Sequence, residues 1–202
     1  MAEKILKRSL AIFDFDGTIT KGDSFIDFLR YTVGPARFYF GCLCLTPYFL
    51  LYLFKIIPNW KAKEIAVTHF FKGHSVDKFQ KSAMDYVDHG LPLIVKRSAL
   101  EKINWHRQQG HSLVVVSASP ENYLKIWCRH NDLALIATKL EEKDGKITGK
   151  LSTANCYGKE KVRRLKENYR LENFEFVYAY GDSEADKALL EIAQEFHFKS
   201  FK

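Results

Sequence analysis

Three short apolar runs in this sequence each end in a cluster of polar residues. The clusters are Asp14-Phe15-Asp16-Gly17-Thr18, Ser117-Ala118-Ser119 and Gly181-Asp182-Ser183. Short apolar runs bounded by turn residues are typical of strands buried on both faces, so the pattern predicts a parallel α/β sheet. Ligands of such sheets bind beyond the carboxyl ends of the strands. The three clusters are therefore expected to meet at one site, although they lie far apart in the chain.

Helical patterns fill the segment between the first and second runs. Amphipathic helices are expected over residues 23–31, 59–71 and 75–89, and a further helix runs from Pro92 to Gln109. The patterns beyond it predict helices over 121–130, 159–169 and 184–193, strands over 133–137 and 196–201, and a hairpin around Asp144-Gly145. The expected fold is α/β, a Rossmann-like parallel-sheet core of residues 1–20 and 91–202. A helical cap domain of residues 21–90 is inserted after its first strand.

Composition narrows the class of partner. The 202 residues include 31 Lys and Arg against 24 Asp and Glu, a net charge of +7 that favours an anionic partner. A phosphate ester and an anionic membrane both fit. Nucleic acid is not expected, because the chain has no nucleic-acid-binding motif and no basic run of five. The four cysteines form no C-x-x-C pair and the first residues do not resemble a secretory signal, so a cytoplasmic protein with reduced thiols is expected.

The first cluster suits phosphoryl transfer. Asp14 and Asp16 are two carboxylates two residues apart at a strand end. One can attack phosphorus and form an aspartyl-phosphate, while the other protonates the leaving oxygen and later activates water. Asp182 ends another strand and can help hold Mg²⁺, and Asp186, one helical turn on, can support that metal site.

Phosphate oxygens need donors and a cation. Ser117 and the backbone N–H groups of the turn at Ala118 can supply the donors, and a lysine near the start of the helix at 159 can supply the charge. Lys159 and Lys161 lie about 200° apart around a helix, so only one of them can face the site. Lys161 is favoured because Leu165, one turn on, places its face toward the core. Lys159 is the alternative.

Taken alone, Ser117-Ala118-Ser119 is more commonly a helix cap, Gly181-Asp182-Ser183 a turn, and a lysine at 159 or 161 a solvated side chain. Together with Asp14-Phe15-Asp16-Gly17-Thr18 and in this order, they resemble one family. Asp14-Phe15-Asp16-Gly17-Thr18, Ser117-Ala118-Ser119, the lysine after Gly158 and Gly181-Asp182-Ser183-Glu184-Ala185-Asp186 resemble the four motifs of haloacid dehalogenase superfamily hydrolases. The similarity is to the branch that includes phosphoserine phosphatases and phosphatidylglycerophosphate phosphatases, and it covers essentially the whole chain. It implies Asp14 as nucleophile, Asp16 as general acid and base, and Mg²⁺ on Asp14, the Asp16 backbone carbonyl and Asp182.

The chain departs from the phosphoserine phosphatases at positions near the substrate. Asp23 stands where those enzymes usually have a glutamate, and Ala185 where they have an asparagine. Their second motif usually reads Ser-Gly-Gly. The resemblance therefore implies that Asp23 affects substrate specificity, and the departures argue against free phosphoserine without excluding it.

The run from Phe38 to Phe54 is rich in aromatic residues and leucine and carries no charge. It is short of the roughly 20 residues of a membrane span, Pro47 interrupts it, and a single span would separate the two halves of the core. It predicts either two cap helices that meet near Pro47 or a surface that contacts lipid. In the second case the flanking Arg37, Lys55, Lys61 and Lys63 would meet anionic headgroups.

The leading hypothesis is a Mg²⁺-dependent phosphomonoester hydrolase for a phosphorylated small molecule or lipid, with peripheral contact to an anionic membrane in the lipid case. A soluble metabolite phosphatase, for phosphoserine or phosphohistidinol, is the second hypothesis. The third is a non-catalytic protein that binds a membrane surface or a partner.

Overall fold

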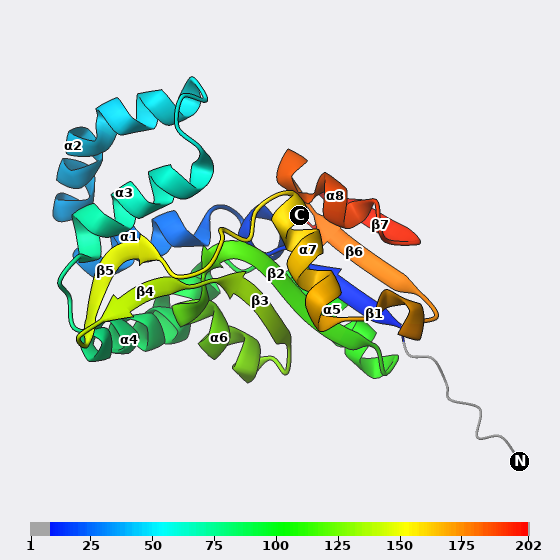
Figure 1. Ribbon diagram of the computed structural model, residues 1–202. Coiled ribbons are helices and arrows are strands. Elements are labelled where there is room, and N and C mark those ends of the chain that lie inside the picture. The colour runs from blue at the N-terminus through cyan, green and yellow to red at the C-terminus, as the bar shows by residue number, and fades with distance from the viewer. Residues whose placement is uncertain (1–8, 202) are drawn as a thin grey trace, which may run out of the picture.

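The computed structural model describes residues 9–201 and contains a central sheet of five parallel strands. The strand order is β3-β2-β1-β6-β7, so β1 lies at the centre (Figure 1). The strands are β1 (Leu10–Phe13), β2 (Ser112–Pro120), β3 (Ala134–Thr138), β6 (Val177–Gly181) and β7 (Glu195–Phe198). The predicted α/β fold with a parallel sheet is confirmed.

Helices cover both faces of the sheet. They are α5 (Arg97–Gln108) and α6 (Glu121–His130) on one face, and α7 (Lys159–Asn168) and α8 (Lys187–Leu190) on the other. Alternate residues of β1 point to opposite faces, as strand geometry requires. Ala11 and Phe13 join the apolar cluster of the first face, and Leu10 and Ile12 join that of the second. All four are completely buried, which is why the strand sequence is apolar throughout rather than alternating.

A helical segment is inserted between β1 and β2. It comprises α1 (Ser24–Val33), α2 (Pro35–Leu53), α3 (Asn59–Phe71) and α4 (Val76–Asp85), then a wide turn (Tyr86–Gly90) and a 3-10 turn (Leu91–Leu93). Two neighbouring connections join it to the sheet. Thr20 pairs with Val95, and the Lys96 N–H donates to the Ile19 carbonyl at 2.8 Å. The helical insertion after the first strand is confirmed, and its boundaries as a domain stay a prediction.

The predicted hairpin forms, but it does not join the central sheet. Its strands are β4 (Leu140–Lys143) and β5 (Lys146–Leu151), which pair antiparallel. It lies against α3 of the helical segment (Figure 1). Gly149 makes this contact possible, because its φ is +95° and a Cβ there would lie 2.3 Å from Thr68 Oγ1. The hairpin thus packs against the inserted helices through α3.

The apolar run is one helix, so the prediction of two helices meeting near Pro47 is wrong. α2 continues through Pro47 and bends along its length (Figure 1). Proline removes one backbone hydrogen bond and crowds the preceding turn, which bends a helix without having to end it. Beside the bend, the Thr46 hydroxyl donates to the Cys42 carbonyl at 3.1 Å.

Two other helices are shorter than predicted. The helix expected from Pro92 begins at Arg97, because Val95 is needed to pair with Thr20. The helix expected over 184–193 is reduced to the 3-10 turn Glu184–Asp186 and to α8. Here the chain turns back early, and the Gln194 N–H donates to the Val177 carbonyl at 3.0 Å at the start of the edge strand β7.

Candidate active site

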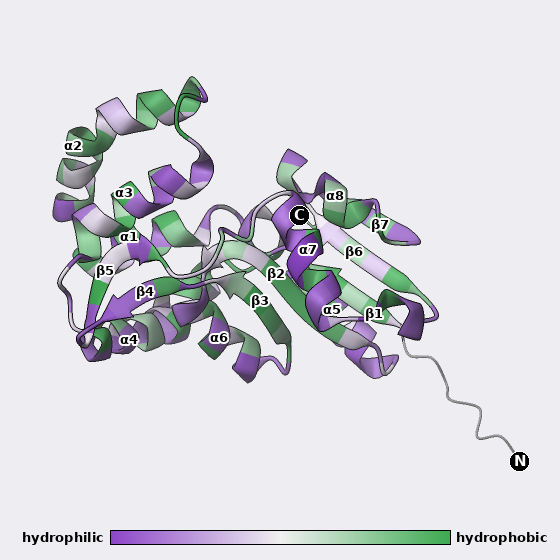
Figure 2. Ribbon diagram, viewed as in Figure 1, coloured by the Kyte–Doolittle hydropathy of each residue, from purple (hydrophilic) through white to green (hydrophobic). Residues whose placement is uncertain are grey.

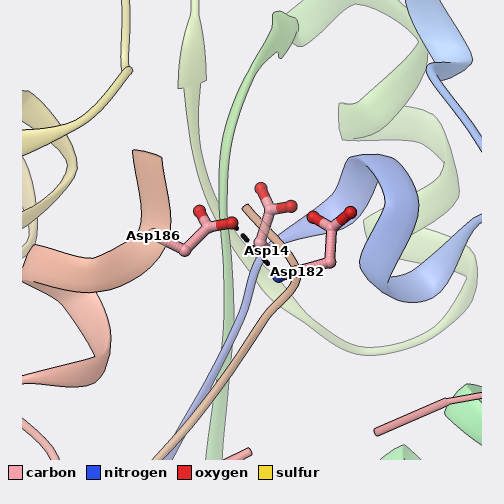
Figure 3. Close-up of side chains that lie close together, drawn as sticks. All are labelled: Asp14, Asp182 and Asp186. Atoms are coloured by element: carbon pink, nitrogen blue, oxygen red, sulfur yellow. Dashed lines mark hydrogen bonds between the residues drawn. The ribbon is translucent and has the colours of Figure 1, made fainter. Parts of the chain in front are cut away.

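Three carboxylates meet where the central strands end. Asp14 follows β1, Asp182 follows β6, and Asp186 lies in the turn after Asp182. β1 and β6 are neighbours in parallel register, and the Asp14 N–H donates to the Tyr180 carbonyl at 2.9 Å. One oxygen atom from each of the three carboxylates lies within 4.8 Å of the other two (Figure 3). The topology thus brings together side chains that are far apart in the sequence.

The loop after β1 wraps closely around Asp182. Gly17 has a φ of +75°, and a Cβ at this position would lie 2.1 Å from Asp182 Oδ2, so no other residue fits. The Thr18 hydroxyl lies 3.3 Å from Asp14 Oδ2 and 3.4 Å from Asp182 Oδ1. Glycine and threonine in this motif are therefore explained by the close approach of the second carboxylate.

The structure brings Lys161, not Lys159, to the site. Lys161 lies in the first turn of α7, and its Nζ is 2.5 Å from Asp14 Oδ1 and 2.6 Å from Asp186 Oδ1. Lys161 is 2% exposed, whereas Lys159 is exposed to solvent. A lysine buried to this extent requires carboxylate partners, and it has two of them.

Burial and charge compete at these groups. Burial raises the pKa of the Asp14 carboxyl to about 7, although the Lys161 ammonium opposes the shift. Burial would lower the pKa of Lys161, but Asp14 and Asp186 hold it above its ordinary value. Burial and the charge of Asp186 also raise the pKa of Asp182. One ammonium group is thus too little positive charge for three ionised carboxylates.

The donor set fits a hard divalent cation. Mg²⁺ binds oxygen ligands at 2.0–2.1 Å, so its ligands lie within about 4.2 Å of one another, close to the spacing of these carboxylates. Both oxygens of Asp186 have partners, since Oδ1 accepts from Lys161 and Oδ2 accepts from the Ser183 hydroxyl at 2.7 Å and from the Ser183 N–H at 3.0 Å. Asp14 Oδ2 and Asp182 Oδ1, by contrast, have only the long contacts of 3.3 and 3.4 Å with the Thr18 hydroxyl. Asp14 and Asp182 are therefore the better-placed ligands, and Asp186 holds the loop and Lys161 in position. The metal roles of Asp14, Asp16, Asp182 and Asp186 stay predictions.

Asp16 lies between the start of α1 and the end of β2. Its Oδ1 accepts from the Ser24 N–H at 2.7 Å and from the Ser24 hydroxyl at 2.5 Å. Its Oδ2 accepts from the Ser119 hydroxyl at 2.6 Å and from the Ser117 hydroxyl at 3.3 Å. Serine hydroxyls donate to a carboxylate and accept from a carboxylic acid. The surroundings therefore suit both protonation states that a general acid and base must adopt.

The second cluster splits into a supporting residue and pocket residues. Ser117 is fully buried, and besides its contact with Asp16 it accepts the Ser119 N–H at 3.0 Å. Ala118 and Ser119 line the pocket. Phosphate binding by Ser117, Ala118 and Lys161 stays a prediction.

A cavity of about 420 Å³ opens over the carboxylates. The inserted helices and the turns that flank them contribute Phe25, Tyr52, Asn59 and Lys63 to its lining, and the sheet side contributes Asp14, Asp182, Ala118 and Ser119. Asp23 also lines the cavity and caps α1, where its Oδ1 accepts from the Phe25 N–H at 2.9 Å and from the Ile26 N–H at 3.0 Å. Its effect on specificity stays a prediction.

Lys63 is the residue of the site that sequence reasoning missed. It was expected at a lipid-facing flank, but its ammonium group points into the cavity and donates to the Ala118 carbonyl and, at 3.1 Å, to Asn155 Oδ1. Burial lowers the pKa of Lys63 to about 8. A signal was present, since Asn59 and Lys63 are four residues apart and share one face of α3. The amide of Asn155 also donates to Asn59 Oδ1 at 2.8 Å.

Comparison with known proteins gives a family and a curated protein found in two strains of one species. Residues 11–191 match the family described as haloacid dehalogenase-like hydrolase. The chain is 37% identical over 196 residues to the protein CicA of Caulobacter vibrioides, which covers 96% of this chain and 86% of the relative.

Solved structures share the fold. A protein of unknown function from Bordetella pertussis Tohama I superimposes with a TM-score of 0.79 at 22% identity, over 94% of this chain and 89% of that one. A phospho-aspartyl intermediate analogue of phosphoserine phosphatase gives a TM-score of 0.68 at 19% identity, over 94% and 85% of the two chains. A substrate-bound phosphoserine phosphatase complex gives 0.65, also at 19% identity, over 95% and 86%.

Proposed function

The chain belongs to the haloacid dehalogenase-like hydrolase family, and from this premise we propose that it is a Mg²⁺-dependent phosphomonoester hydrolase that works through a phosphorylated Asp14. The observation that carries the proposal is the group of Asp14, Asp182, Asp186 and Lys161 beneath a cavity, in which only Asp182 is half-buried and the others are buried. Asp16 lies at the same edge of the sheet.

In the first half of the reaction, a carboxylate oxygen of Asp14 attacks phosphorus and the bond from phosphorus to the ester oxygen breaks. Asp16 in its acid form gives its proton to the leaving oxygen. Lys161 offsets the negative charge around Asp14 and holds the attacking carboxylate in place through its contact at 2.5 Å. A Mg²⁺ ion held by Asp14 and Asp182 would neutralise charge on the phosphoryl oxygens.

In the second half, the ionised Asp16 takes a proton from water, and the water oxygen attacks the phosphorus of the aspartyl-phosphate. The bond between Asp14 and phosphorus breaks, which restores the carboxylate and releases inorganic phosphate. The serines around Asp16 stabilise its ionised form after the first half and orient it for the second.

The cavity supports a substrate with an apolar part. Lys63 and Asn59 offer polar contacts, while Phe25 and Tyr52 offer aromatic ones. Tyr52 also connects the cavity with α2, whose side chains are mostly apolar. A lipid or partly apolar phosphate ester fits this lining. We also propose that the enzyme acts in the cytoplasm. A soluble metabolite such as phosphoserine remains the competing substrate class.

A phosphate-release screen tests the proposal. We expect the Mg²⁺-loaded protein to hydrolyse a small aryl phosphate, and to show a higher kcat/KM for phosphate esters with an apolar part than for phosphoserine. Turnover of phosphoserine alone would favour the soluble metabolite hypothesis. If the folded protein releases phosphate from none of these esters, the catalytic proposal is wrong and the non-catalytic hypothesis takes its place.

Lys63→Met is expected to lower kcat/KM about 10-fold or more, because one charge-assisted contact to an anionic substrate is lost. Because burial lowers the pKa of Lys63 to about 8, its ammonium loses its proton progressively as the pH rises through that value. Substrate affinity should therefore fall as the pH rises through about 8, which the pH profile of kcat/KM reports for the free enzyme.

Lys63→Arg is the diagnostic variant, since its guanidinium stays charged and should remove the decline above pH 8. Lys61→Met is the matched control, because Lys61 is an exposed lysine on the same helix and pairs with Glu64. An unchanged decline in Lys63→Arg would mean that another group titrates.

A further inference from the structure

The surface around α2 is unusually apolar. In residues 9–201, eleven of the nineteen exposed large hydrophobic side chains lie between Tyr39 and Trp60. Phe40, Leu43, Phe54 and Ile56 are 68%, 70%, 74% and 66% exposed. Figure 2 shows hydrophobic colouring along much of α2 and the turn after it. We call the exposed side chains of residues 39–60 the α2 surface. Clusters of exposed apolar side chains commonly mark an interaction site, so this surface indicates a covering partner.

The charge of this region identifies the partner. Between Asp27 and Glu64 the sequence contains no acidic residue, but it contains Arg30, Arg37, Lys55, Lys61 and Lys63. Arg30 pairs with Asp27 and Lys61 pairs with Glu64, at the two ends of this stretch. Lys63 points into the cavity, and Arg37 and Lys55 are exposed beside the apolar side chains. An apolar surface bordered by these two cations matches an anionic bilayer, where acyl chains lie beneath negative headgroups.

The aromatic residues favour the same partner. The α2 surface includes Tyr39, Tyr48 and Trp60, and Tyr52 lies half-buried beside them. Tyrosine and tryptophan concentrate at the boundary between acyl chains and water, because their rings are apolar and their hydroxyl or N–H groups are polar. We propose that the α2 surface docks the protein on an anionic lipid bilayer.

The helix would lie in the interface rather than cross the bilayer. By length and composition α2 could span a membrane, since it has 19 residues and most of them are apolar. Both of its ends are tied to the same body, however. Near its N-terminal end, Gly41 abuts the ring of Phe70, where a Cβ would lie 2.4 Å away, and near its C-terminal end Tyr52 accepts from Asn59 at 3.2 Å. A spanning α2 would break both contacts and draw α3, with its charged residues, across the membrane.

Docking would also place the cavity at the membrane. Tyr52 lines the cavity and belongs to the helix that would enter the interface. A phosphate ester carried by a membrane lipid would then reach Asp14 without leaving the bilayer surface. This consequence rests on the proposed function, whereas docking itself does not.

A second copy of the chain is a poorer fit for the same surface. In a two-fold contact the surface would face itself, and its cations would meet like charges. The acidic side chains at the ends of this stretch, Asp27 and Glu64, already pair with Arg30 and Lys61 and leave no acidic partner for Arg37 and Lys55 within it.

Vesicle flotation tests the docking. The full chain is mixed with phosphatidylcholine vesicles with or without about 30% phosphatidylglycerol, at a low and a high salt concentration. We expect flotation with the anionic vesicles, and at least severalfold weaker binding when phosphatidylglycerol is omitted or the salt is raised, because each cation near a negative surface contributes to binding.

Two pairs of double variants separate the causes. Leu43→Ser with Phe54→Ser removes apolar area and should weaken vesicle binding at least about tenfold. Its control, Phe196→Ser with Phe198→Ser, removes two exposed aromatic residues on β7 and should bind as the wild type does. Arg37→Gln with Lys55→Gln should reduce the salt dependence, whereas Lys143→Gln with Lys166→Gln, at exposed sites elsewhere, should not.

Hydrolysis of a small aryl phosphate without vesicles is measured on every variant as an independent check of folding and of the proposed chemistry. Wild-type protein that hydrolyses this ester but does not float with anionic vesicles overturns the docking and leaves the proposed function intact. Wild-type protein that floats with anionic vesicles but does not hydrolyse the ester supports the docking and overturns the proposed function. Sedimentation measures the oligomeric state. If the wild type is a dimer that does not bind vesicles, and Leu43→Ser with Phe54→Ser disrupts that dimer, the α2 surface binds a second copy instead.

Discussion

Asp14→Asn is expected to lower kcat by about 10³-fold or more while the protein stays folded. An amide of the same size does not attack phosphorus, so the covalent step is lost. Folding should survive, because burial already disfavours the charged form of Asp14, whose pKa is raised to about 7. The thermal midpoint without metal is therefore expected to stay within a few degrees of the wild type, since the lost contact with Lys161 is offset by relief of carboxylate repulsion.

Phosphate release and the thermal midpoint are the two measurements for Asp14→Asn. Asp77→Asn, in the first turn of α4 and remote from the cavity, is the matched control and should keep full activity. Beryllium fluoride with Mg²⁺ should stabilise the wild type against heat and should not stabilise Asp14→Asn, because it occupies the place of the transferred phosphoryl group. More than a small percentage of wild-type turnover in Asp14→Asn would contradict the covalent mechanism.

Asp182→Ala is expected to remove most of the Mg²⁺-dependent activity, with a loss of about 10²-fold or more. Asp182 supplies one of the two carboxylates best placed for the metal, and Gly17 leaves room for it. Burial and the charge of Asp186 raise the pKa of Asp182, so its removal should not destabilise the metal-free fold. The measurement is a Mg²⁺ titration of phosphate release on chelator-treated protein.

Asp186→Ala is the informative comparison for Asp182→Ala. The Mg²⁺ affinity of Asp186→Ala should fall about 10–100-fold, as happens when a residue that orients a metal ligand is lost. It should also destabilise the protein, because Lys161 loses a partner at 2.6 Å and the loop at Ser183 loses its acceptor. Glu184→Ala, an exposed neighbour paired with Lys187, is the matched control. Full activity of chelator-treated wild type would show that the reaction needs no metal.

Local sequence was sufficient for the sheet and the floor of the site. Strands such as Leu10–Phe13 are apolar because both faces are buried, so they can be recognised in the sequence as uninterrupted apolar runs. Once the strands are parallel, their carboxyl ends must share one edge, so Asp14 and Asp182 had to meet there. The choice between Lys159 and Lys161 also followed from helix geometry, and the structure places Lys161 beside Asp14.

Contacts between distant segments decided the rest. Lys63 is one of several cations near an apolar run, and only the packing of α3 against β5 directs it to the Ala118 carbonyl at the end of β2. The Asp144-Gly145 turn predicts a hairpin, but its position under α3 depends on the close contact of Gly149 with Thr68. These arrangements join residues tens of positions apart, and no local propensity specifies such pairings.

The α2 surface shows the same division most clearly. A charge-free run of aromatic residues and leucine predicts burial somewhere, but composition alone does not say whether protein or lipid provides it. In the tertiary structure most of this run is exposed, because α3 packs against only one side of α2, where Phe38 and Gly41 are buried. Pro47 bends the helix instead of ending it, since one lost hydrogen bond costs less than the whole C-terminal half of a long helix. Burial is a property of the assembled surfaces, and it is settled only when the helices have packed.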